Sequence, residues 1–316
     1  MKNYADVSVV IPYFNDSLYI EKALDSIFYQ KVKPKEIIIV DDCSDDSDLL
    51  CNIIEENRRK NLINIVYIRN ETNRNGAYSR NLGIIKSQYK FVAFLDADDY
   101  WSSEHLSISI KHMQNENLDF IFSNVIEVLE GCEKIRKVND PRSLKNENDI
   151  LFFSPPQTNS FLIKKSIFIQ NGIFFDVNLK RHQDYQFLIL CLNSDIKWSY
   201  LDVNTTYYRI PSKCKIRTVD YNSMLTFWNN NYSYFTEKYI KSYILGICVD
   251  YYFFQGKVNF LSAFNDKESI QFVLNDFLIK LMLKIEVRGE KVRLIFKFMH
   301  YFKNKRKYFL HKLIVG

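Results

Sequence analysis

The sequence predicts an α/β protein in which a mostly parallel sheet is flanked by helices. Three observations support this: four short apolar runs in the first 100 residues, helical spacing of apolar residues between them, and polar or acidic residues where most of the runs end. Strands and helices that alternate in this way form right-handed βαβ units and a doubly wound sheet. With 316 residues, 47% of them hydrophobic, the chain is long enough for one large domain with an appendage, or for two domains.

The elements of the first 100 residues follow one another closely. Continuous apolar runs predict strands at Val7–Tyr13, Glu36–Val40, Asn64–Arg69 and Phe91–Leu95. Helices are expected between them, at Ser17–Gln30, Asp48–Lys60 and Gly76–Ser87. Asn15, Asp16 or Ser17 is available as the N-cap of the first helix.

The pattern is less regular after residue 100. Strands are expected at Phe120–Leu129, Ser160–Ile163 and Thr205–Ile210. We predict that residues 101–219 close over the sheet as a layer for a second substrate, so that residues 1–219 form one domain in two halves. Residues 220–316 are rich in Tyr, Phe, Asn and Lys with helical periodicity, which predicts a separate helical C-terminal region.

Polar side chains gather at the predicted strand ends, where doubly wound sheets bind their ligands. They include Pro12–Asn15, Asp41–Asp42 and Asp96–Asp99. No GxGxxG follows the first strand and no GxxxxGK[ST] occurs, which argues against dinucleotide and P-loop sites. If the ligand is a nucleotide, acidic residues facing its diphosphate require a hard cation between them. The sequence therefore predicts Mn²⁺ or Mg²⁺ as the cofactor.

Four segments resemble, in order, the successive blocks of glycosyltransferase family 2. They are VSVVIPYFN, EIIIVDDCSDDS, NRNGAYSRNLGI and FLDADDYW, and the resemblance covers residues 5–215. It implies a GT-A fold and an inverting, metal-dependent transfer of one sugar from a nucleotide-sugar, expected to be a UDP-sugar, to a hydroxyl of a carbohydrate acceptor. Residues 1–100 would then be the nucleotide-binding half and residues 101–219 the acceptor-binding half.

The resemblance also assigns roles to residues of the nucleotide-binding half. Asp98, with Asp96 beside it in a DxD-like element, would hold the metal. The alternative is that these acids cap the next helix, with Ser102, Ser103 and Glu104 in its early turns. Asp41 and Asp42 would contact the base and the ribose, with Asp41 the more plausible base contact. The alternatives are that they shape an Asx-type turn or belong to a solvated acidic loop. Further nucleotide contacts are expected from Pro12, Tyr13 through its backbone or a stacked ring, Asn15, Ala97, and Arg80, which would reach a phosphate or a sheet-end aspartate.

The catalytic base is expected at Asp184. The segment KRHQDYQF resembles the part of the family in which an acidic pair opens a helix and the second acid is the base. A plain helix N-cap is the alternative. Gln183 stands where the family usually has glutamate, which leaves the acceptor contact at this position open. Acceptor contacts are predicted at Asp99, His182 and Gln183.

Arg209 lies at the end of the last predicted strand and Lys213 follows it. The sequence is compatible with a lid of these cations over the diphosphate, and equally with a solvated basic loop.

The charge is unevenly distributed, because residues 1–100 carry 13 Lys and Arg against 16 Asp and Glu, whereas residues 279–316 carry 11 against 2. A basic amphipathic tail favours peripheral contact with the inner face of a bacterial cytoplasmic membrane, and the alternative is a helix packed on the rest of the protein. With no leader pattern, spanning segment or cysteine pairing, the protein is expected in the cytoplasm. The predicted setting is surface-polysaccharide synthesis, such as O-antigen or capsule, on a polyprenyl-diphosphate-linked acceptor; a nucleic-acid partner is not expected.

Two other functions are compatible with parts of the sequence. A sugar-nucleotidyltransferase would use the same kind of sheet, but it normally carries a basic glycine-rich loop after the first strand, which IPYFND lacks. A non-enzymatic basic module that binds membrane or nucleic acid through its tail would leave the acidic sheet edge unexplained.

Overall fold

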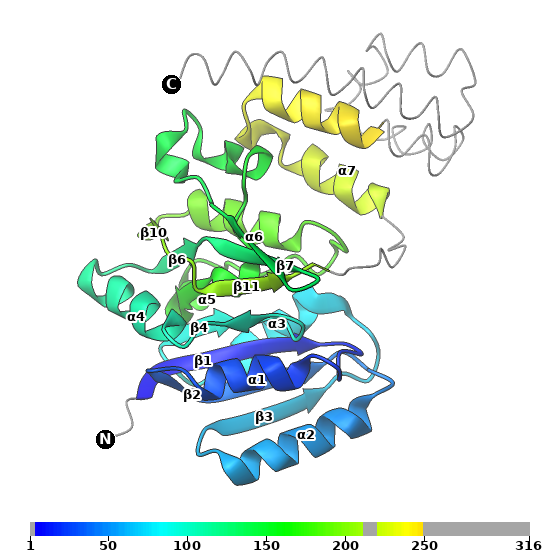
Figure 1. Ribbon diagram of the computed structural model, residues 1–316. Helices are drawn as coiled ribbons and strands as arrows, with labels where there is room; N and C mark the ends of the chain where they lie inside the picture. Colours follow the sequence, from blue (N-terminus) through cyan, green and yellow to red (C-terminus); the bar gives the residue numbers. More distant parts are fainter. Residues whose placement is uncertain (1–3, 211–219, 249–316) are drawn as a thin grey trace. The chain divides into compact units, whose positions relative to one another are not determined.

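The computed structural model describes residues 4–210 and 220–248 (Figure 1). The chain divides into two compact units, Met1–Thr218 and Val219–Gly316. The first unit contains both sheets and all the predicted site residues. We describe each unit by itself.

The larger sheet of the first unit has seven strands in the order β10-β6-β9-β4-β1-β2-β3 (Figure 1). Their bounds are β1 Tyr4–Tyr13, β2 Lys33–Asp41, β3 Asn64–Arg69, β4 Phe91–Phe94, β6 Phe120–Ser123, β9 Leu162–Lys164 and β10 Trp198–Leu201. All neighbouring pairs are parallel except those of β9, which runs antiparallel to β4 and β6. The predicted α/β class with a mostly parallel sheet is confirmed.

A second, four-stranded sheet has the order β5-β11-β7-β8. It consists of β5 Tyr100–Trp101, β11 Thr206–Arg209, β7 Val125–Leu129 and β8 Cys132–Arg136. The segment Phe120–Leu129 is thus two strands in two sheets: β6 is buried throughout, as a central strand should be, whereas β7 becomes exposed toward its end. The half at residues 101–210 is not simply a layer over the first, because β6, β9 and β10 extend the same sheet.

Helices cover both faces of the larger sheet, as predicted. α1 Ile20–Phe28, α2 Ser47–Lys60 and α4 His105–Asn115 share one core with alternate residues of β1, namely Val7, Val9, Ile11 and Tyr13. α3 Asn75–Lys86 and α6 Gln183–Leu192 pack on the other face, where Gly83 meets Val10 and Phe187 meets Phe94. The first unit also contains α5 Lys165–Gln170 and short 3-10 helices at Pro141–Ser143, Glu147–Phe152 and Thr158–Ser160.

Two local features depart from, or explain, the sequence pattern. α1 begins at Ile20 and not at Ser17, because the carbonyl of Asp16 accepts hydrogen bonds from the Tyr19 and Ile20 N–H groups in a preceding turn. Its N-cap is Tyr19, with no side-chain cap, so the predicted N-cap at residues 15–17 is wrong. On α3, a Cβ at Gly83 would lie 2.3 Å from a methyl carbon of Val10, so only glycine allows this helix its close approach to β1.

The described part of the second unit, residues 220–248, is helical, and the helical region predicted for residues 220–316 as a whole stays a prediction. α7 covers Tyr221–Asn230, a 3-10 turn covers Tyr232–Tyr234, and residues 237–248 are helical. The Trp228 ring contacts Phe227, Phe235 and Tyr243, with centroids 4.8, 5.2 and 4.8 Å away. The basic segment 279–316 lies outside the described residues. In the part of the chain that is described, no helix has the length and apolar character needed to cross a bilayer.

Candidate active site

Strand register brings the predicted site residues to one edge of the larger sheet. Tyr13 at the end of β1 is the partner of Asp41 at the end of β2, and Asp41 is in turn the partner of Arg69 on β3. On the other side of β1, Val10 is the partner of Phe94, so Asp96–Asp99 follow β4 at the same edge. The carboxyl ends of β1, β2 and β4 therefore meet, as the sequence predicted.

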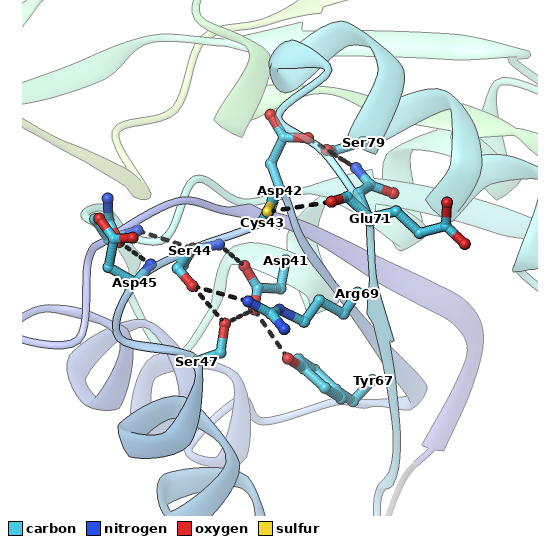
Figure 2. A network of polar contacts seen from close by, with 12 residues as sticks. Asp41, Asp42, Cys43, Ser44, Asp45, Ser47, Tyr67, Arg69, Glu71 and Ser79 are labelled. Carbon is cyan, nitrogen blue, oxygen red and sulfur yellow. Dashed lines mark hydrogen bonds and ion pairs between the residues drawn. The ribbon is translucent and has the colours of Figure 1, made fainter.

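Asp41 is buried in a dense hydrogen-bond network (Figure 2). Its Oδ1 accepts from the Ser44 N–H at 2.9 Å, and its Oδ2 accepts from the hydroxyls of Ser47 at 2.5 Å and Tyr67 at 2.9 Å. Burial alone would raise the pKa of Asp41, but hydrogen bonds from Ser44, Ser47 and Tyr67 bring it below its ordinary value. The carboxylate therefore shapes the turn after β2, as the structural alternative proposed, and a base contact at Asp41 stays a prediction.

We expect Tyr67→Phe to lower the free energy of unfolding by about 1–2 kcal/mol at pH 7, because it removes a donor from a buried carboxylate. A carboxylate whose pKa is lowered by folding stabilises the fold at pH values above its unfolded-state pKa, and this contribution is lost as the pH falls. The difference in unfolding free energy between the variant and the wild type should therefore shrink in acid. Urea denaturation at pH 7 and pH 3.5 measures this. Tyr29→Phe, at a residue that is 75% exposed, is the control, and equal stability of all three proteins at pH 7 would contradict the role of Tyr67.

Asp42 fixes the start of α3 from the neighbouring strand end. Its Oδ1 accepts from the Asn70 amide and the Arg74 N–H, and its Oδ2 accepts from the Asn75 N–H, each at 2.8 Å. The side chain is 3% exposed, so in this conformation it faces the protein. A ribose contact at Asp42 stays a prediction. The role that the structure shows is to hold Asn75 in its left-handed conformation, with φ at 73°.

Asn15 joins the loops that follow β1 and β2. Its N–H donates to Ser44 Oγ at 3.1 Å and its side-chain oxygen accepts from the Asp45 N–H at 2.8 Å. Asn15 itself is exposed, with φ at 54°, and Pro12 is half-buried. The two hydrogen bonds fix Asn15 beside the loop after β2, and nucleotide contacts by Asn15 and Pro12 stay predictions.

The ring of Tyr13 is 1% exposed and belongs to the core between β1 and α1. Its predicted stacking on a nucleobase is therefore wrong, although its carbonyl, which accepts from the Asp42 N–H at 2.9 Å, lies at the sheet edge. The neighbouring Phe14 is 47% exposed at the same strand end. Phe14 is not among the site residues predicted from the sequence. The alternation of side chains along β1 turns Phe14 away from the face that buries Tyr13, but the sequence alone does not show which of the two rings is the buried one.

Asp96 and Asp98 are half-buried, whereas Ala97 and Asp99 between and after them are buried. This alternation leaves the two carboxylates of the DxD-like element accessible and makes a contact to the Ala97 side chain impossible, leaving only its backbone. The next helix, α4, begins at His105, after β5, and its N-cap is Glu104. Asp96–Asp99 therefore do not cap that helix, and the structural alternative for these acids is wrong.

Asp99 connects three segments of the site. Its 1% exposed carboxylate accepts from the Asn159 amide at 2.5 Å and from the Arg209 N–H at 2.8 Å. Burial raises the pKa of Asp99 well above its ordinary value, and the charges of Asp98 and Asp96 raise it further. Both carboxylate oxygens of Asp99 already accept hydrogen bonds from protein groups. This conformation therefore disfavours a direct contact between Asp99 and an acceptor. Asp99 instead positions Arg209, whose Nε donates to the Asp98 carbonyl at 3.1 Å.

Arg80 bridges the two halves of the site. One terminal nitrogen of its guanidinium donates to Asp96 Oδ1 at 2.6 Å, and the other lies 3.5 Å from the side-chain oxygen of Gln183. Gln183 also donates to the Leu179 carbonyl at 2.6 Å and lies 3.4 Å from the side-chain oxygen of Asn75. Of the two contacts predicted for Arg80, the structure shows the one to a sheet-end aspartate. An amide suits position 183 because it accepts from Arg80 and donates to a carbonyl.

Asp184 is the second residue of α6, as expected for an acid at a helix N-terminus. Burial raises the pKa of this half-buried carboxyl, partly offset by the Tyr185 N–H and the charge of Arg80, and the charge of Asp96 raises it too. Asp184 is thus within electrostatic reach of Asp96. The helix that carries Asp184 is anchored through Phe187, whose ring stacks on that of Phe175 with centroids 4.3 Å apart. Phe175 is itself fixed by Asn81 of α3, which exchanges hydrogen bonds with its backbone at 2.8 and 3.0 Å.

His182 precedes α6 as its N-cap, with φ at 65°. Its ring stacks on Tyr185 with centroids 4.7 Å apart. Burial and the neighbouring Arg181 lower the pKa of His182 to about 3, so the imidazole is neutral at physiological pH. Its predicted acceptor contact stays a prediction, and Lys213 lies outside the described residues.

Asp96 and Asp98 fit a divalent cation that brings other ligands with it. Mg²⁺ is usually bound by one or two carboxylates together with phosphate oxygens of the substrate. Within residues 4–210 and 220–248, no group of three or more His, Cys, Asp or Glu side chains could hold a metal ion by itself. The site therefore has the carboxylates for such a cation but needs a ligand to complete its coordination.

Known proteins are similar to this chain in sequence and in fold. WfaP of Escherichia coli, a UDP-Glc:α-D-GlcNAc-diphosphoundecaprenol β-1,3-glucosyltransferase, is 26% identical over 273 residues, 83% of this chain and 98% of WfaP. TarS of Staphylococcus aureus, in its structure with UDP-GlcNAc, gives a TM-score of 0.60 at 22% identity, over 86% of this chain and 80% of that one. A mannosyltransferase of Pyrobaculum calidifontis, solved with GDP-Man and Mn²⁺, gives 0.56 at 13% identity, over 92% and 85%.

These likenesses confirm the GT-A fold that the sequence resemblance implied. The model of the family described as glycosyl transferase family 2 matches residues 8–176. Because this match covers more than half of the 316 residues, the chain belongs to glycosyl transferase family 2.

Proposed function

We propose that this protein is an inverting glycosyltransferase that moves one sugar from a UDP-sugar to a hydroxyl of a carbohydrate acceptor, with Asp184 as the catalytic base. The observation that carries the proposal is the bridge from Asp96 through Arg80 to Gln183, beside Asp184. This bridge connects the end of β4, where we place the donor diphosphate, with the start of α6, where we place the acceptor. A sugar that lies between them would present its anomeric carbon to an activated hydroxyl.

Inversion by a single displacement needs one carboxylate that removes the proton of the attacking hydroxyl. Asp184 can take that proton, and its raised pKa makes it a stronger base than an ordinary aspartate. Arg80, 13% exposed, holds Asp96 in place by its ion pair. Asp98 and Asp96 would hold Mn²⁺ or Mg²⁺, which when bound would neutralise the charge of the departing diphosphate. Arg209, fixed by Asp98 and Asp99, would add a positive charge at the same edge.

Phe14 is the aromatic side chain that we assign to the nucleobase. We expect Phe14→Ala to weaken UDP binding about tenfold, because a base stacked on an aromatic ring is stabilised by about 1–3 kcal/mol. Isothermal titration calorimetry with UDP and Mn²⁺ measures the affinity. Leu18→Ala is the control, since Leu18 is 87% exposed in the same loop and offers no π face. An equal loss in both variants would contradict stacking.

The acceptor setting is proposed from three lines of support. WfaP acts on a diphosphoundecaprenol-linked acceptor, and the relative TarS is a poly(ribitol-phosphate) N-acetylglucosaminyltransferase, 29% identical over 208 residues, 64% of this chain and 35% of TarS. The C-terminal segment 279–316 is strongly basic. A lipid-linked acceptor of bacterial surface polysaccharide, met at the inner face of the cytoplasmic membrane by a peripheral enzyme, agrees with these features. O-antigen and capsule are the polysaccharides proposed.

Hydrolysis of the donor tests the proposal without a known acceptor. Purified protein with Mn²⁺ and a panel of UDP-sugars should release UDP slowly, and chelation with EDTA should stop it. Release of UTP from UDP-sugar and pyrophosphate would indicate a sugar-nucleotidyltransferase instead. No turnover of, and no binding to, any nucleotide-sugar would leave the non-enzymatic basic module as the function.

A further inference from the structure

Two cations lie on one face of the smaller sheet, beside the DxD-like element. Tyr100 of β5 pairs with Tyr207 of β11, and their rings stack with centroids 4.5 Å apart at 10°. The Lys22 ammonium, from α1, lies 3.5 Å from the centroid of the Tyr100 ring. Arg209 is two residues beyond Tyr207 and therefore on the same face of β11. Its guanidinium lies 4.2 Å from the centroid of the Tyr19 ring, one turn before Lys22 on the chain.

Within the described residues, neither the Lys22 ammonium nor the Arg209 guanidinium forms an ion pair with a carboxylate. Lys22 makes no ion pair there, and Arg209 uses its Nε and its backbone N–H, which leaves its two terminal nitrogens without a hydrogen bond to the described part of the protein. Lys35 differs from Lys22 in this respect, because it also lies over a tyrosine ring, that of Tyr89, but forms an ion pair with Asp6. Lys22 and Arg209 thus offer donors that no described side chain uses.

The positive charges of Lys22 and Arg209 repel each other when no anion lies between them. Burial lowers the pKa of Lys22, and the charge of Arg209 lowers it further. Val128 of β7 pairs with Arg209 on one side and with Glu133 of β8 on the other. The charge of Glu133 raises the pKa of Lys22, but Glu133 makes no ion pair with Lys22. An anion that contacts both cations would remove the repulsion. Phosphate suits the pair, since arginine binds it through two parallel hydrogen bonds and lysine through a point charge.

We propose that Lys22 and Arg209 form a phosphate-binding subsite next to Asp98, on the Tyr100–Tyr207 face of the smaller sheet. The inference rests on the proposed function for the source of the phosphate, which is either the diphosphate of the donor or a phosphate carried by the acceptor. The anchoring of Arg209 to Asp98 and Asp99 places the subsite at the reaction centre and not on a remote surface.

Calorimetric titrations of Lys22→Gln separate the two sources. UDP with Mn²⁺ reports on the donor, and inorganic pyrophosphate added to UDP-saturated protein reports on a second phosphate site. Pyrophosphate added to protein without nucleotide tests the subsite even if UDP does not bind, so failure of the proposed function and failure of the subsite are distinguishable. Lys35→Gln is the matched control, Lys22→Arg should retain binding, and thermal unfolding checks that each variant is folded.

If the phosphate belongs to the donor, Lys22→Gln should weaken UDP binding about tenfold, the loss expected for one charge-assisted hydrogen bond. If it belongs to the acceptor, UDP affinity should be unchanged and pyrophosphate binding to the UDP-saturated protein should fall about tenfold. Either result supports the subsite. The subsite would be overturned if Lys22→Gln bound both UDP and pyrophosphate as tightly as the wild type and Lys35→Gln do.

Discussion

Replacing Asp184 with asparagine should lower the turnover of the UDP-sugar by about a thousandfold, within the range lost with a general base, and leave the affinity for UDP unchanged. Asparagine keeps the size of the side chain and its place at the start of α6, but it cannot take a proton from the attacking hydroxyl or water. Release of UDP measures turnover and calorimetry measures affinity. Asp195→Asn, at an exposed acid just beyond the other end of α6, is the matched control.

The pH dependence gives an independent check on the role of Asp184. Because its pKa is raised, turnover should fall with decreasing pH at a midpoint above the ordinary range of aspartate, and the residual turnover of Asp184→Asn should lack that midpoint. The folded protein binds this proton more tightly than the unfolded chain does, so Asp184 lowers stability as pH rises through that window. Asp184→Asn should therefore be at least as stable as the wild type at pH 8 in urea. Wild-type turnover by Asp184→Asn would remove Asp184 from the mechanism.

The parts of the site that lie on strand ends could be predicted from sequence. Continuous apolar runs mark buried parallel strands, and a parallel sheet must gather their carboxyl ends at one edge. This logic placed Asp41–Asp42 and Asp96–Asp99 together without any contact information. The direction in which each side chain points could not be predicted in this way, because a strand that is buried on both faces shows no alternation of polar and apolar residues. Nothing in IPYFN tells which ring, Tyr13 or Phe14, faces the core.

Contacts between distant segments could not be predicted. Gln183 reaches Asn75 and Arg80 across more than 100 residues, and Asn159 reaches Asp99 across 60. Such contacts depend on how α6 packs through Phe187 on Phe94 and Phe175, which periodicity does not specify. The division of 120–129 into β6 and β7 has the same origin. The run is mostly apolar, with Ser123 and Asn124 in its middle, and only the pairing partners decide that one sheet ends there and the other begins.

Asp98→Asn should abolish metal-dependent turnover, with a loss of about a thousandfold or more, because the metal would supply most of the charge stabilisation of the leaving diphosphate. With no described cluster of three ligating side chains, Mn²⁺ alone should bind only weakly. Tight Mn²⁺ binding should require UDP, whose phosphate oxygens complete the coordination. Electron paramagnetic resonance of Mn²⁺, with and without UDP, measures this coupling directly.

Asp96→Asn should differ from Asp98→Asn in a way that the structure specifies. Asp96 also holds Arg80 at 2.6 Å, so its replacement should loosen the bridge to Gln183 and lower turnover beyond the loss that weaker Mn²⁺ binding explains. Saturating Mn²⁺ should therefore restore only part of the activity of Asp96→Asn, because it corrects the weakened metal binding of this variant but not the loosened Arg80. Asp25→Asn, at an exposed acid on α1, controls for the loss of one negative charge. Tight binding of Mn²⁺ to Asp98→Asn in the presence of UDP would show that the cation is held elsewhere.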